Sequence, residues 1–112
     1  MSIAVRFTEE DLAAIDAALT QLDQRFAKLV ALDTKERRRL YKMGNKAEGF
    51  CREALAVLDK NRQLASPAMD VNGALVALRT IDELRPRTRQ ILRLAERMRD
   101  TELALGAEVA TT

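Results

Sequence analysis

The sequence contains no histidine in 112 residues. Histidine titrates near neutral pH, so its absence excludes the commonest general base, the usual catalytic triads and histidine-ligated metal or haem centres. Glycine-rich phosphate loops are also missing, because the four glycines are isolated from one another. The carboxylate clusters sit on outward or helix-start positions, which do not suit acid–base catalysis. We therefore predict a protein that is not an enzyme and that binds no cofactor or metal ion.

Cysteine and long hydrophobic runs are scarce. The single cysteine, Cys51, cannot form an internal disulfide, which is typical of a reducing compartment. Its apolar neighbours Phe50 and Ala54 favour a packed thiol over a nucleophile. No run approaches the roughly 18 uncharged apolar residues that a membrane span needs, and the N-terminus lacks the apolar core of a signal peptide. These features predict a cytoplasmic protein without a membrane partner.

The residues that are abundant favour helices. Hydrophobic residues make up 47% of the chain, aromatic residues 4% and charged residues 32%. The hydrophobic share comes mainly from leucine, alanine, valine and isoleucine, and glycine and proline are few, a mixture that favours helices over sheets. The length is close to the commonest size of one compact domain. We predict a single all-α domain over residues 1–112.

The first helix has the clearest signals. Thr8 is a good N-cap, and Asp11 is spaced to complete a capping box. Apolar residues then recur at steps of three and four, which places them on one helical face. This apolar stripe consists of Leu12, Ile15, Leu19, Leu22, Phe26 and Leu29. We expect the helix to end near Leu32 and its stripe to be buried in a core.

Two further helices are expected before residue 61. Asp33 begins a short helix, which ends before the turn at Gly44 and Asn45. Asn45 and Glu48 are spaced as a capping box for a helix from about residue 46 to about residue 60. A broad buried face is expected on that helix, formed by Ala47, Phe50, Cys51, Ala54, Leu55, Val57 and Leu58. One helix continuing through Gly44 is the alternative.

The last helical segment contains a proline. After a loop over residues 61–69, Asp70 is expected to cap a helix that reaches Pro86, where the ring removes one hydrogen bond and clashes with the preceding turn. The apolar pattern stays in phase across Pro86, so one kinked helix and two nearly collinear helices fit equally well. The segments together predict an up-and-down antiparallel bundle of three long helical segments and one short helix, kinked or broken at Pro86.

The net charge of +2 is unevenly distributed. Residues 1–33 carry a net charge of −3, residues 34–66 carry +5, and residues 67–112 are neutral. The densest positive cluster comprises Lys35, Arg37, Arg38, Arg39, Lys42 and Lys46. A solvated face that pairs with the acidic first helix is the favoured interpretation, since base-reading and stacking side chains are few. Weak nucleic-acid binding through residues 35–46 is the alternative.

A second basic feature lies on the last helix, where an arginine repeats every four residues. This arginine ridge comprises Arg85, Arg89, Arg93 and Arg97. Acidic residues interleaved with the ridge predict intrahelical ion pairs. The alternative is that the ridge binds a protein partner, either an acidic protein surface or the acidic first helix of another subunit. Leu103, Leu105 and Val109 either close the end of the bundle or support self-association.

Several short segments carry a resemblance to a known family. They are Leu32–Arg38 (LDTKERR), Lys42–Lys46 (KMGNK), Phe50 and Asp100–Gly106 (DTELALG). In these segments the chain resembles a family of small, uncharacterised bacterial helical proteins, over most of residues 8–106. The resemblance implies a bacterial cytosolic origin and relatives that continue as a helix beyond the position of Thr112, and it supplies no binding residues. The sequence as a whole predicts a bundle that acts through protein–protein contacts, by self-association or as an adaptor.

Overall fold

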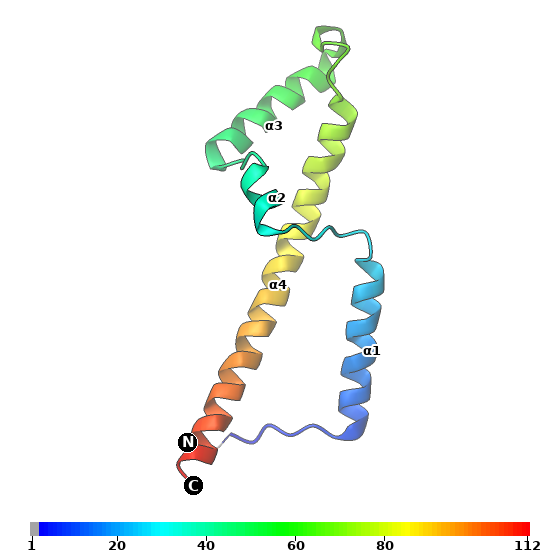
Figure 1. Cartoon of the computed structure of the whole chain (residues 1–112). Helices are drawn as coiled ribbons and strands as arrows, with labels where there is room; N and C mark the ends of the chain where they lie inside the picture. The colour runs from blue at the N-terminus through cyan, green and yellow to red at the C-terminus, as the bar shows by residue number, and fades with distance from the viewer. Residues whose placement is uncertain (1–2) are drawn as a thin grey trace. The chain divides into compact units, whose positions relative to one another are not determined.

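The computed structural model describes residues 3–112, and every regular element in that range is helical. The elements are α1 (Glu9–Arg25), α2 (Thr34–Arg39), α3 (Asn45–Lys60), the one-turn 3-10 helix η1 (Arg62–Leu64) and α4 (Val71–Ala110), as labelled in Figure 1. The prediction of an all-α chain with three long helices and one short helix is therefore confirmed.

Backbone contacts group the chain into two units. Unit 1 comprises the residues up to Tyr41 together with Ala107–Thr112, and unit 2 comprises Lys42–Gly106. Unit 1 holds α1 and α2, whereas unit 2 holds α3, η1 and most of α4. The expectation of a single domain over residues 1–112 stays a prediction.

In unit 1, α1 begins at the predicted cap. The Thr8 hydroxyl accepts a hydrogen bond from the Asp11 backbone N–H at 3.0 Å, and the Asp11 carboxylate accepts one from the Thr8 N–H at 3.0 Å. The helix ends at Arg25, well before the predicted stop near Leu32. The three-and-four spacing of apolar residues identifies a face but contains no stop signal, so the pattern overestimated the length of this helix.

The other parts of unit 1 are held by local and terminal hydrogen bonds. Asp33 caps α2, since its carboxylate accepts the Glu36 N–H at 2.7 Å and the Glu36 carboxylate accepts the Asp33 N–H at 3.4 Å. The Ile3 N–H donates to Glu108 Oε1 at 2.5 Å. This bond attaches the start of the described chain to the last turns of α4.

In unit 2, α3 begins without the predicted capping box. Gly44 occupies the N-cap in an extended conformation and supplies no side-chain hydrogen bond, so Asn45 already lies inside the helix. The Glu48 carboxylate, assigned to the box by its spacing, instead binds two arginines. Residues 40–44 between α2 and α3 are not helical, so the alternative of one helix through Gly44 is wrong. Asn61 ends α3, and its side-chain amide donates to the Val57 carbonyl at 2.9 Å.

The start of α4 matches its prediction. The Asp70 carboxylate accepts the Gly73 N–H at 2.8 Å, and any Cβ at Gly73 would collide with that carboxylate. The helix then continues through Pro86 to Ala110, visible as one unbroken ribbon in Figure 1. Pro86 is exposed, so the backbone carbonyl that lost its partner can bind water. Of the two alternatives at Pro86, the single helix is correct.

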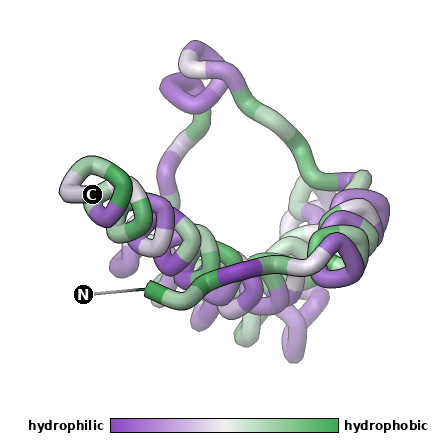
Figure 2. The backbone as a smooth tube through the Cα atoms, turned by 90° about the horizontal axis from the view of Figure 1, so that it is seen from below, coloured by the Kyte–Doolittle hydropathy of each residue, from purple (hydrophilic) through white to green (hydrophobic). Residues whose placement is uncertain are grey.

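Burial differs from what a packed bundle requires. Val71, 5% exposed, is the one buried residue in the part of the chain that the structure describes. The stripe residues Leu12, Leu19 and Leu22 are exposed, and so are Phe50 and Val57 of α3, which were expected in the core. Figure 2 shows hydrophobic and hydrophilic residues alternating along the tube, as in amphipathic helices. The expected bundle core is therefore absent from residues 3–112. The prediction failed because periodicity identifies an apolar face but does not show what covers it.

Candidate functional site

Four charged side chains connect α3 to α4 within unit 2. Arg85 donates to Glu48 through both terminal nitrogens, at 2.9 and 2.5 Å. Arg52 donates to the same carboxylate through Nε at 3.0 Å and to Asp82 through both terminal nitrogens at 3.1 and 2.7 Å. The result is an alternating chain of charges, Asp82 to Arg52 to Glu48 to Arg85, with two bidentate arginine–carboxylate pairs. We call it the ion-pair network.

The network compensates for a wide separation between the two helices. No Cα atom of α3 lies within 8 Å of a Cα atom of α4 in unit 2. The long side chains of Arg52 and Arg85 bridge this separation. Beneath them, half-buried apolar residues line α3 and α4, namely Ala47, Cys51, Ala54, Leu55, Leu58, Ala74, Leu75, Leu78 and Ile81. The network thus holds a loosely packed helical hairpin together.

The two arginines strongly acidify Glu48. Hydrogen bonds from Arg85 first and Arg52 second lower the pKa of Glu48 from 4.5 to about 2, and the Glu48 side chain is only 18% exposed. The hydrogen bonds that Arg52 donates to Asp82 raise the pKa of Arg52, and those that Arg85 donates to Glu48 raise the pKa of Arg85. A carboxylate held ionised by two arginines is a poor general acid or base at neutral pH. The network is therefore a structural connection between helices.

Three further features of residues 3–112 bear on the chemistry that the chain can support. No group of three or more histidine, cysteine, aspartate or glutamate side chains is placed to hold a metal ion there. Cys51 is a free, half-buried thiol on the face of α3 that carries Ala47, Ala54 and Leu55. No helix in the described range is long and apolar enough to cross a membrane.

The structure divides the predicted arginine ridge. Arg85 belongs to the ion-pair network, whereas Arg89, Arg93 and Arg97 are exposed along α4. Within residues 3–112, none of these three arginines forms an ion pair with an acidic residue of α4. The predicted intrahelical ion pairs are thus not formed. Three cationic side chains remain without a carboxylate partner.

The predicted basic segment is divided between the two units. Lys35, Arg37, Arg38 and Arg39 lie on α2 in unit 1, whereas Lys42 and Lys46 belong to unit 2. Lys35, Arg38 and Arg39 are exposed, and in the described range they make no ion pair with the acidic residues of α1. For these three residues, the expected pairing with the first helix is therefore not seen.

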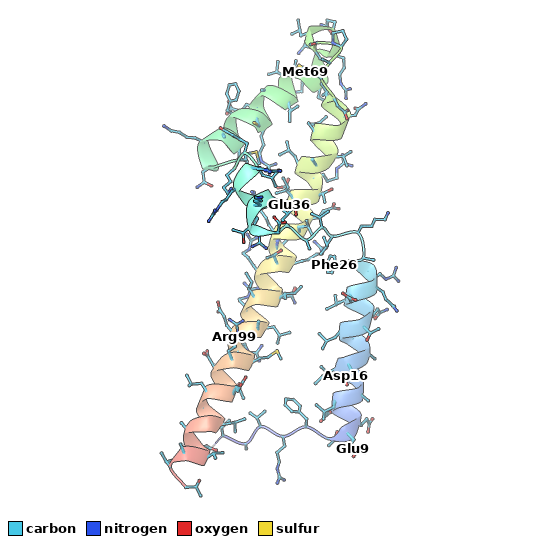
Figure 3. All side chains as sticks on the ribbon, viewed as in Figure 1. Glu9, Asp16, Phe26, Glu36, Met69 and Arg99 are labelled. Atoms are coloured by element: carbon cyan, nitrogen blue, oxygen red, sulfur yellow. The ribbon has the colours of Figure 1, made fainter. Side chains whose placement is uncertain are left out.

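The apolar stripe of α1 is uncovered in unit 1. Leu12 is 47% exposed, Ile15 41%, Leu19 57% and Leu22 45%. Phe26, labelled in Figure 3 at the end of α1, is half-buried. All residues of α1 itself are exposed, and the helix gains nothing from a covered core. An amphipathic helix whose whole apolar face meets water is typical of a helix that binds a partner.

A second apolar face is exposed on the part of α4 beyond Pro86. Ile91 is 48% exposed, Leu94 52% and Met98 63%. Leu84, Ala95 and Leu105 are half-buried on the same helix. The hairpin with α3 does not reach this part of α4, because the last ion pair of the network is at Arg85. The chain thus presents two uncovered apolar faces, one in each unit.

No protein-family model, curated protein or solved structure matches the chain. The resemblance to small bacterial helical proteins in Leu32–Arg38 and Asp100–Gly106 therefore stays a prediction.

Sequence reasoning missed the ion-pair network, although two signals for it were present. Glu48 and Arg52 are four residues apart, the spacing of an intrahelical pair. In an antiparallel hairpin, residues at similar distances before and after the loop lie opposite each other, and Glu48 and Arg85 satisfy this rule, as do Arg52 and Asp82. The pairing of Glu48 with the two arginines was missed because Glu48 was interpreted as a capping residue.

Proposed function

We propose that the chain acts through protein–protein contacts, as a self-associating or adaptor protein and not as an enzyme, with α1 as its principal binding surface. The observation that carries the proposal is the exposure of the α1 stripe, where Leu12, Ile15, Leu19 and Leu22 are each between 41% and 57% exposed. A partner helix on this stripe would supply the packing of the bundle that the sequence predicts.

Burial of the stripe would release substantial free energy. Each square ångström of apolar surface removed from water contributes about 25 cal/mol, and a leucine or isoleucine buried in full contributes about 1.5–3 kcal/mol. Most helices of this length also depend on tertiary packing for their stability in water. Capping by Thr8 and Asp11 preorders the first turn of α1, which lowers the entropic cost of binding.

The residues beside the stripe suit a close helix–helix contact. The stripe is bordered by small side chains, so the backbone of a second helix could approach α1 closely. These small residues are Ala14 and Ala18, which lie on one side of the stripe. A cytoplasmic location is part of the proposal, since Cys51 is a free thiol of the kind kept reduced in that compartment.

The experiment is a concentration series of the molar mass, measured by light scattering, for the natural chain, Leu19→Lys and Gln21→Lys. Both variants add one lysine to α1. Leu19 lies on the stripe, whereas Gln21 is an exposed position off the stripe, so Gln21→Lys is the control. We expect the mass of the natural chain and of Gln21→Lys to rise with concentration, and that of Leu19→Lys to stay monomeric.

An adaptor role without self-association would instead give a partner that is captured by the natural chain and by Gln21→Lys but not by Leu19→Lys. A natural chain that is monomeric at every concentration and that captures no partner dependent on Leu19 contradicts the proposal.

Weak nucleic-acid binding through residues 35–46 is the second candidate. The exposure of Lys35, Arg38 and Arg39 on α2 favours it. Titration with duplex and single-stranded nucleic acid at low and moderate salt tests this candidate, because phosphate contacts give an affinity that falls steeply with salt. Failure to bind at low salt contradicts it.

A further inference from the structure

The two helical segments that carry the exposed apolar faces have opposite net charge. From Glu9 to Arg25, α1 has five acidic residues and one basic residue, a net charge of −4. From Arg87 to Arg99, α4 has five arginines and one glutamate, a net charge of +4. Each face lacks a neutralising partner, since α1 makes no ion pair in the described range and neither do these arginines of α4. Complementary charge of this kind favours one specific pairing of surfaces.

Both faces also repeat with the same period. On α1, Leu12 and Leu19 are seven residues apart, and so are Ile15 and Leu22. On α4, apolar residues recur every seven residues at Leu84, Ile91, Met98 and Leu105. A seven-residue repeat keeps an apolar seam facing a partner helix over its full length, as in coiled coils. The two helices therefore suit left-handed side-by-side packing.

Charged residues occupy the edges of both seams. Asp16 and Asp23 on α1 each lie four residues after one stripe residue and three before the next. On α4, Arg87 lies between Leu84 and Ile91, and Arg99 lies four residues after Ala95. Edge positions determine which partner a coiled coil accepts and in which orientation. Figure 3 labels Asp16 on α1 and Arg99 on α4.

We propose that two copies of the chain associate by reciprocal pairing, with α1 of each copy packed on residues 84–105 of α4 of the other copy. This inference rests on the proposed self-association and names the two surfaces that meet. At 1.5 Å per residue, α1 is about 25 Å long and residues 84–105 span about 33 Å, so the whole stripe of α1 is matched.

A second copy is the occupant that accounts for both faces at once. Each face is uncovered within its own unit, since Leu19 of unit 1 is 57% exposed and Met98 of unit 2 is 63% exposed. A symmetric pair forms two equivalent contacts, which bury α1 and α4 of both copies. Neither face is then available for binding a further chain. Arg85 takes no part in this contact, because it is already bound to Glu48.

Complementary charge reversal tests the pairing. One variant carries Asp16→Lys and Asp23→Lys, and the other carries Arg87→Glu and Arg99→Glu. Each variant alone places like charges along both contacts of a pair, so we expect its self-association to weaken roughly tenfold or more. In an equimolar mixture, every contact between unlike chains is attractive. Native mass spectrometry should therefore detect a dimer that contains one copy of each variant.

A control variant and a measurement of helicity complete the test. Arg89→Glu with Arg93→Glu changes the charge of α4 by the same amount at positions away from the seam, and it should associate like the natural chain. Circular dichroism establishes that every variant retains its helices. The proposal is contradicted if the mixture stays monomeric, which is the outcome expected when α1 packs on α4 of the same chain. It is also contradicted if the Arg89 and Arg93 variant is equally disruptive.

Failure of this pairing is distinguishable from failure of the proposed function. If both charge-reversal variants associate like the natural chain while Leu19→Lys remains monomeric, α1 binds a surface other than residues 84–105 and the reciprocal pairing is wrong. If Leu19→Lys also associates like the natural chain and captures the same partners, the proposed role of the α1 stripe is wrong as well.

Discussion

The hairpin of α3 and α4 and the helix α1 differ in how far their apolar residues are covered. Both contain amphipathic helices, yet the hairpin covers its apolar residues in part and connects its helices by the ion-pair network. In α1 every residue is exposed, and its own stabilising contacts are the local bonds of the Thr8 cap. The comparison teaches that the hairpin has stabilising contacts between its two helices, whereas the apolar face of α1 has no cover within unit 1.

The largest expected effect is at the one buried side chain of the described range. Val71→Ala removes two methyl groups from a site that is 5% exposed, and we expect the free energy of unfolding of the hairpin to fall by about 2 kcal/mol. Val76→Ala makes the same change at a site on α4 that is 57% exposed, and it should stay within about 0.5 kcal/mol of the natural chain. Urea denaturation followed by circular dichroism measures both. Equal losses would show that Val71 is not part of a core.

Removal of the α1 cap comes next. Thr8→Ala deletes the hydroxyl that accepts the Asp11 N–H, a change that costs about 1 kcal/mol in typical helices. Because the monomeric α1 has no covered face, we expect this loss to appear as fraying of α1, with lower helicity at low protein concentration. Chemical shifts of residues 9–25 report it directly. Unchanged shifts would mean that packing, and not the cap, maintains α1.

The ion-pair network predicts a dependence on pH that is confined to the hairpin. The pKa of Glu48 is lowered to about 2, so its ionised form stabilises the fold above the ordinary pKa of 4.5, and this stabilisation is lost as the pH falls toward 2. The protection factors of the α3 amides, which correct for the intrinsic slowing of exchange in acid, should therefore fall below pH 4.5. Glu48→Gln should remove most of this fall, whereas Glu53→Gln, at an exposed position of α3, should retain it. The same acid response in both variants would contradict the role of Glu48.

The smallest effect on unfolding is expected on the α1 stripe. Leu19 is 57% exposed, so Leu19→Ala should change the stability of the monomer by less than about 0.5 kcal/mol. The same substitution should weaken self-association clearly, because it removes apolar surface from the proposed contact. Unfolding at low concentration and sedimentation at high concentration separate the two effects. A large loss of monomer stability would show that the chain itself covers Leu19.

Local signals in the sequence predicted local structure well. The caps at Thr8, Asp33 and Asp70 were all identified, because each bond links a side chain to a backbone N–H three residues further along. The wrong predictions concern where a helix ends and which distant residue a side chain binds. Nothing in the pattern around Leu29 marked the end of α1, and Glu48 was assigned to a nearby cap when its partner Arg85 lies 37 residues away.

The candidate binding surfaces were predictable only in part. The spacing of Leu12, Leu19 and Leu22 identified the apolar face of α1, but burial in the same chain was assumed and is not observed. The arginines of α4 were recognised as a basic feature, although ion pairs within the helix were expected to neutralise them. Side-chain chemistry thus identified the faces, while the partner of each face depends on tertiary and quaternary contacts that a single helix does not encode.

Amide hydrogen exchange of the natural chain at several protein concentrations tests the central claim most directly. The account predicts that protection of α1 and of residues 84–105 increases with concentration, while α3 keeps the same protection throughout. Protection of α1 that is already high and constant at the lowest concentration would contradict the account, because the stripe would then be covered within one chain.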